Sequence, residues 1–142
     1  HLAYVLEGIK YIAALEARPM TVETDGQTYS GEYVFGAFSN TVSIGGMLHY
    51  DSALVDMNDG KLEMLLIRKP ASLGEVHRLI HALGSSSFDD PLFDFAASSV
   101  FRLQSESGFD WSVDGERAAG GPKVEIACVK SAVCITVPAR KD

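Results

Sequence analysis

Two stretches of the chain carry apolar residues at helical spacing. In most of the rest, apolar and polar residues alternate in short runs. The first stretch predicts an amphipathic helix over Leu2–Ala17, which Pro19 should end because the residue before a proline disfavours the helical conformation. The second begins at Ser72, which has capping-box spacing with Glu75, and Gly84 is the expected C-terminal stop. The pattern therefore predicts two helices, far apart in the sequence.

Outside these helices, runs rich in β-branched and aromatic residues predict strands. They are Met20–Thr24, Thr28–Phe38, Lys61–Arg68, Phe95–Gln104, Phe109–Val113, Lys123–Lys130 and Ala132–Val137. Asp25-Gly26 should supply the positive φ angles of a tight hairpin between the first two. Lys61–Arg68 is apolar on both faces and should be covered on both. The pattern favours a mainly β fold, an antiparallel β-sandwich lobe or barrel-like sheet with two helices, as one domain over residues 1–142.

The composition limits the classes of function. With 142 residues, 46% of them apolar and 22% charged, the chain should fold around a hydrophobic core. A net charge of -7 argues against nucleic-acid binding and against purely electrostatic docking on an anionic membrane. No apolar stretch approaches the roughly 20 residues of a membrane-spanning helix. Cys128 and Cys134 lie in apolar runs and are expected to be buried free thiols, which favours the cytoplasm.

Three Asp-Gly pairs each predict an ordinary turn when taken alone. Two of them belong to a larger set of four segments that follow one another in a specific order. These segments are Ser39-Asn40 with the later pair Gly45-Gly46, Tyr50–Met64 around Asp59-Gly60, Asp114-Gly115-Glu116, and Lys130–Pro138. In this order they resemble the diacylglycerol and sphingosine kinase superfamily, and most closely its bacterial soluble lipid kinases. Asp51 stands where that family usually has a proline.

The resemblance implies a fold, a reaction and partners. In that family a C-terminal β-sandwich lobe completes a cleft with an N-terminal α/β lobe, whose Gly-Gly-Asp-Gly loop holds ATP. The present sequence has no such loop, so the ATP-binding lobe is expected to be absent from this chain and the chain alone inactive. The implied reaction is ATP-dependent phosphorylation of the hydroxyl of diacylglycerol, giving phosphatidic acid. The implied partners are the lipid, the N-terminal lobe, a second copy in a homodimer, and transiently the inner membrane face.

The resemblance also assigns roles to individual residues. Phosphoryl transfer needs Mg²⁺ and a group that deprotonates the attacking hydroxyl. Glu116 matches the family's proton acceptor, with Asp114 as the rival for that role. A structural Mg²⁺ would be held by the backbone carbonyls of Asp56 and Lys61 and by the side chain of Asp59. The acyl chains would need an apolar groove, expected between the sandwich and the second helix.

Other functions stay open at this stage. The chain could be a non-catalytic lipid-binding or interaction module derived from the same lobe, or a relative that phosphorylates a sphingoid base or NAD. His77 and His81 have the spacing of a metal site, but they fall on the polar face of the second helix and are expected to be solvated. Phe109 and Trp111 are expected in the core or in a cleft wall, since an acidic chain is a poor stacking platform for nucleic acid.

Overall fold

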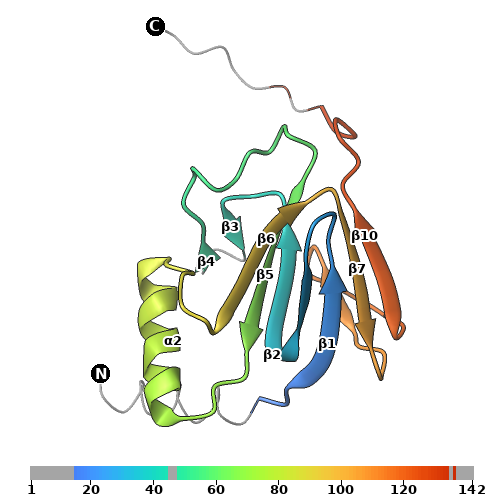
Figure 1. The fold of residues 1–142 in the computed structure, drawn as a ribbon. Coiled ribbons are helices and arrows are strands. Elements are labelled where there is room, and N and C mark those ends of the chain that lie inside the picture. The colour runs from blue at the N-terminus through green and yellow to red at the C-terminus, as the bar shows by residue number, and fades with distance from the viewer. Residues whose placement is uncertain (1–14, 45–47, 135, 137–142) are drawn as a thin grey trace, which may run out of the picture.

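The computed structural model describes residues 15–44, 48–134 and 136 as a mainly antiparallel β fold with one helix, which confirms the predicted fold class (Figure 1). The helix, α2, spans Leu73–Ser85. The strands are β1 (Arg18–Glu23), β2 (Thr28–Ser39), β3 (Ser43–Ile44), β4 (Leu48–His49), β5 (Leu62–Arg68), β6 (Phe93–Ser98), β7 (Val100–Ser105), β8 (Trp111–Val113), β9 (Glu116–Ala118) and β10 (Lys123–Ala127).

Six of the strands form one antiparallel sheet in the order β10-β7-β1-β2-β5-β6, and the others form two short ribbons, β3-β4 and β8-β9. The edge strand β6 is joined to β7, near the opposite edge, through Ser99 alone. A link of one residue is only possible if the sheet curls until these strands meet. The carbonyl of Ser99 also accepts a hydrogen bond from the backbone N–H of Cys128, just after β10, at 2.9 Å. The curl gives the sheet an inner and an outer face.

Strand β5 is buried on both faces, as its sequence predicts. Met64 and Leu66 point into the inner cluster, together with Val22, Phe101 and Leu103 from the strands around the curl. Leu65 and Ile67 point to the outer face, where Leu79 and Ala82 of α2 cover them. Figure 1 shows α2 beside the β5-β6 side of the sheet. The core therefore has two layers, with β5 between them.

The helix begins as the sequence predicts and ends two residues later than expected. The Ser72 hydroxyl accepts a hydrogen bond from the Glu75 N–H at 3.2 Å, which satisfies one of the free donors of the first turn. The Glu75 carboxylate accepts from the N–H of Ala71 at 2.6 Å, one residue before the position that a capping box uses. The predicted stop at Gly84 is wrong: Ser86 is the C-cap, with φ 54°, and Gly84 lies within the helix. Ser86 can close the helix because its N–H reaches the carbonyl of Ala82.

The hairpin between β1 and β2 forms, but not with the predicted turn. The N–H of Thr24 donates to the carbonyl of Gln27 at 2.9 Å across a loop of four residues. Neither Asp25 nor Gly26 has a positive φ angle, so the prediction of a positive-φ turn here is wrong. The longer loop relieves the need for such angles, and it frees the Asp25 carboxylate to contact another part of the sheet.

Several other predicted boundaries change. The run Phe95–Gln104 is two strands, because Ser99 turns the chain at the curl. The run Lys123–Lys130 leaves the sheet after Ala127, and the described residues of Ala132–Val137 form no strand. Most of the predicted helix Leu2–Ala17 lies outside the described residues, and 15–17 are not helical. A β-bulge interrupts β2 between Tyr33 and Phe35.

The two cysteines are free, as predicted, but they are not buried. Cys128 is half-buried and Cys134 is exposed, because the chain leaves the sheet after β10 and the expected closing strand does not form in the described part. Within the described residues, no helix is both long enough and apolar enough to span a membrane.

Asp25 should make stability depend on pH. Its carboxylate accepts hydrogen bonds from the hydroxyls of Ser99 at 2.8 Å and Ser98 at 3.0 Å, and these bonds hold its pKa below the usual value of 3.8. A lowered pKa means that the contribution is present above about pH 4 and is lost as the pH falls through the folded-state pKa. Wild type should therefore lose melting temperature relative to Asp25→Asn between about pH 4 and pH 2. Asp89→Asn, at an exposed loop carboxylate, is the matched control, and parallel curves for all three proteins would contradict the role of Asp25.

Candidate functional site

Three of the four motif segments meet at one end of the sheet. The side-chain amide of Asn40, just after β2, donates a hydrogen bond to the carbonyl of Met57 at 3.3 Å. The side chain of Lys130 packs against Gly60 at the start of β5. These contacts place the Ser39-Asn40 segment, the Asp59-Gly60 segment and the closing segment side by side, although they are far apart in the sequence.

The loop of Asp56, Asp59 and Lys61 is a pair of tight turns. The carbonyl of Asp56 accepts from the Asp59 N–H at 3.2 Å, and the Asp59 carboxylate accepts from the Lys61 N–H at 2.8 Å. Gly60 has φ 83°, which a side chain would strain. One oxygen of the Asp59 carboxylate and the carbonyls of Asp56 and Lys61 form a hard-oxygen donor set of the kind that Mg²⁺ prefers. The residues of the loop therefore fit the predicted metal in chemistry, although no three carboxylate, histidine or cysteine side chains converge anywhere in the described residues.

Beneath this loop lies a buried carboxylate that the sequence analysis did not single out. Glu63 is only 1% exposed, and neither of its side-chain oxygens has a hydrogen-bond partner in the described part of the chain. Burial raises the pKa of Glu63, and the carboxylates of Asp59 and Asp56 raise it further. One sequence signal existed: Glu63 is an acidic residue within a strand that was expected to be covered on both faces.

Asp114 and Gly115 form a two-residue hairpin turn between β8 and β9, and Glu116 follows it. Asp114 has φ 49° and Gly115 has φ 90°, the left-handed pair that an Asp-Gly turn of this kind requires. Val113 pairs with Glu116 across the turn, so the turn places Asp114 at the tip and Glu116 at the first position of the return strand. Both carboxylates are exposed. The structure thus presents both carboxylates to solvent, and neither takes part in an ion pair among the described residues.

Trp111, at the start of the same hairpin, fixes where the hairpin sits. Its ring contacts Phe109 at 5.1 Å and Phe38 at 6.1 Å between centroids, which confirms that the two predicted aromatic residues belong to the core. Phe38 immediately precedes Ser39-Asn40. The base of the Asp114-Gly115-Glu116 hairpin is therefore anchored near the end of the sheet where the other three segments meet.

The surroundings of α2 contain no open apolar groove in the described residues, but the two histidines of the helix are solvated as predicted. The apolar groove predicted between the helix and the sheet is filled by packed side chains, among them Leu79, Leu65 and Ile67. His77 and His81 are exposed, as predicted, and line a shallow cavity of about 370 Å³. Gly45-Gly46 lies outside the described residues.

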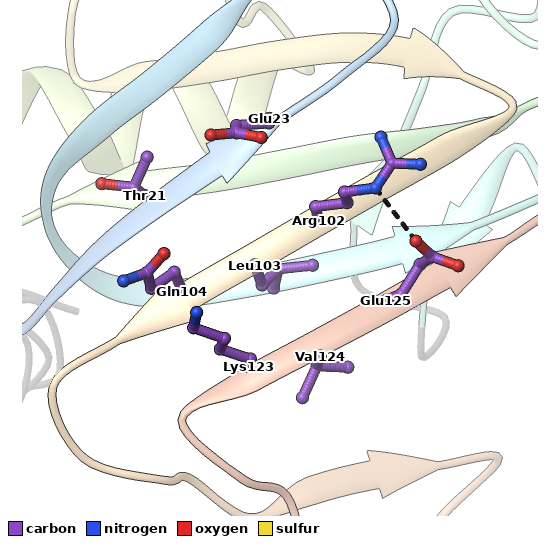
Figure 2. A pocket seen from close by; sticks show the side chains of 8 residues that line it. All are labelled: Thr21, Glu23, Arg102, Leu103, Gln104, Lys123, Val124 and Glu125. Carbon is purple, nitrogen blue, oxygen red and sulfur yellow. Dashed lines mark hydrogen bonds and ion pairs between the residues drawn. The ribbon is translucent and has the colours of Figure 1, made fainter.

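A second cavity, of about 390 Å³, lies on the outer face of β1, β7 and β10. Figure 2 shows alternate residues of these strands on that face, with an ion pair of 3.0 Å between Arg102 and Glu125. The intervening residues, such as Leu103 and Val124, belong to the inner cluster. None of the predicted site residues lines this cavity, and its mixed charges are typical of a solvent-facing sheet surface.

No protein-family model and no curated protein sequence matches the chain. Solved structures do. One from Bacillus anthracis str. Sterne, described as a "putative diacylglycerol kinase", superimposes with a TM-score of 0.69 at 21% identity, over 89% of this chain and 43% of that one. A second structure with that description gives 0.66 at 20% identity, over 86% and 41%. A third, of diacylglycerol kinases from the same organism, gives 0.52 at 18% identity, over 84% and 41%.

The chain has a diacylglycerol kinase-like fold. The resemblance first suggested by the four sequence segments is thus confirmed at the level of the fold. The chain spans less than half the length of each of these three proteins, so it corresponds to one part of them.

Proposed function

We propose that this chain is the β lobe of an ATP-dependent lipid kinase that phosphorylates the hydroxyl of diacylglycerol or a related lipid alcohol. The observation that carries the proposal is the meeting of the Ser39-Asn40, Asp59-Gly60 and Lys130 segments at one end of a sheet with a diacylglycerol kinase-like fold. The segments are recognised in the sequence by their resemblance to a family. The contacts between them come from the structure and are independent of that resemblance.

The proposed chemistry divides between this chain and an ATP-binding lobe. Glu116, exposed at the start of β9 beside the Asp114-Gly115 turn, would accept the proton of the lipid hydroxyl as it attacks the γ-phosphate, and Asp114 is the alternative for this role. Asp56, Asp59 and Lys61 would hold Mg²⁺, whose charge stabilises the loop that leads into β5. ATP would be held by the other lobe, as the family resemblance implies.

The lipid would approach from outside the lobe, since the space between α2 and the sheet is filled. Exposed apolar side chains on the loop between β4 and β5 and on the chain after β10 are available for such contact: Leu54, Met57, Val129 and Val133. With a net charge of -7, contact with a membrane would depend on side chains of this kind more than on electrostatic attraction.

A lipid-panel assay on the full-length protein tests the proposal. With ATP and Mg²⁺, diacylglycerol should be converted to phosphatidate, and chelation of the metal should remove most of the activity. Ceramide, a sphingoid base and NAD are the competing acceptors in the panel. The 142-residue chain alone should transfer no phosphate. If the full-length protein binds lipid vesicles but phosphorylates no acceptor, the lobe is a binding module and the kinase proposal fails.

A further inference from the structure

Five side-chain oxygen atoms near the loop between β4 and β5 are buried without hydrogen-bond partners in the described part of the chain. They are the hydroxyl of Ser39, the side-chain carbonyl of Asn40, the hydroxyl of Tyr50 and both carboxylate oxygens of Glu63. We call this set the buried oxygen cluster. Native proteins rarely leave buried polar atoms unpaired, so a group of them in one place indicates a ligand.

The fold brings these residues together from three segments. Ser39 and Glu63 are opposite each other in the β2-β5 ladder, so their side chains lie on the same face of the sheet. Tyr50 packs against Phe88 and Phe95 on that outer face. Burial raises the pKa of Tyr50 to about 12, with the nearby Ser39 hydroxyl acting against the rise and the Glu63 carboxylate adding to it. Asn40 is tied to the covering loop by its bond to Met57.

The charge of the cluster needs compensation. Glu63 takes part in none of the ion pairs among the described residues, and its nearest charged neighbours include Asp56 and Asp59, which carry the same sign. An unpaired carboxylate is strongly disfavoured at a buried position. Every atom of the cluster is an oxygen, and hard cations are bound by such sets of carboxylate, amide-carbonyl and hydroxyl oxygens.

We propose that the buried oxygen cluster binds a hard divalent cation, such as Mg²⁺ or Ca²⁺, with Glu63 as its charged ligand and Asn40, Ser39 and Tyr50 as neutral ones. This site is distinct from the predicted magnesium loop, whose donors are Asp59 and the carbonyls of Asp56 and Lys61. Both sites adjoin the loop between β4 and β5, so a cation in the cluster would help to fix that loop. The proposal does not depend on kinase activity.

Calorimetric titration of the 142-residue chain with MgCl₂ and with CaCl₂ tests the proposal without ATP or lipid. Glu63→Gln keeps the shape of the side chain and removes its charge, and it should weaken cation binding at least tenfold. Asp59→Asn, which alters the loop site, is the matched control and should weaken cation binding less.

Melting temperatures give a second test. In the presence of a chelator, Glu63→Gln should melt at a higher temperature than wild type, because the unpaired buried charge is gone. Saturating cation should raise the melting temperature of wild type by roughly 5 °C and leave Glu63→Gln unchanged.

Terbium luminescence tests cation binding at the cluster by a second route, which does not need Glu63→Gln to fold. Terbium, a hard cation that tyrosine excites at short range, should emit when bound to wild type, and Tyr50→Phe should remove most of that emission. Excess Ca²⁺ should displace the terbium. The proposal is overturned if Glu63→Gln binds cations as wild type does, if only Asp59→Asn loses binding, or if no cation raises the melting temperature of wild type. The first two outcomes would leave the proposed kinase function intact.

Discussion

Glu116→Gln in the full-length protein is expected to lower kcat for lipid phosphorylation by about 10²- to 10⁴-fold, the usual contribution of a general base. The amide keeps the size of the side chain but cannot accept the proton of the lipid hydroxyl. KM for the lipid should change little, because the lost interaction belongs to the transition state. Glu116 is exposed at the start of β9, so the melting temperature should stay near that of wild type. Initial rates over a range of lipid concentrations give both constants.

Two variants make the result specific. Asp114→Asn removes the rival carboxylate while keeping the turn, because asparagine tolerates the φ of 49° at this position. It should keep kcat within about tenfold of wild type. Glu106→Gln, at an exposed glutamate in the loop after β7, should be fully active. If Asp114→Asn is inactive and Glu116→Gln is not, the proton acceptor is Asp114. If both remain active, neither carboxylate is the base.

Phe101→Ala is expected to cost about 3–5 kcal/mol of folding free energy, enough to unfold much of a domain of this size. Phe101 is fully buried in the inner cluster and meets Phe38 edge-to-face at 5.1 Å. The truncation leaves a cavity within the inner cluster. Denaturant unfolding followed by circular dichroism measures the loss.

Phe35→Ala is the matched control for this cavity, because it removes the same atoms from a strand of the same sheet. Phe35 is 39% exposed, so its truncation should cost much less than that of Phe101. Equal losses for the two variants would mean that the inner cluster is not the main source of stability.

The predicted magnesium loop and the buried oxygen cluster differ in how far the sequence alone predicts them. Asp56, Asp59 and Lys61 are close in the chain, so a resemblance in sequence can mark them as a unit. The buried oxygen cluster draws on residues as far apart in the chain as Ser39 and Glu63, and the β2-β5 register brings these two together. Glu63 alone gave a signal, as a charge within an apolar strand.

The sequence by itself determined the features that depend on neighbours in the chain. The start of α2 after Ser72, the double-faced burial of β5 and the two-residue turn at Asp114-Gly115 follow from local periodicity, capping and backbone preference. Only the tertiary structure decided the curl of the sheet at Ser99, the absence of a strand among the described residues of Ala132–Val137 and the filling of the space under α2. These features depend on which strands pair and which side chains meet across the core. The spacing of residues along one segment predicts neither the pairing nor these contacts.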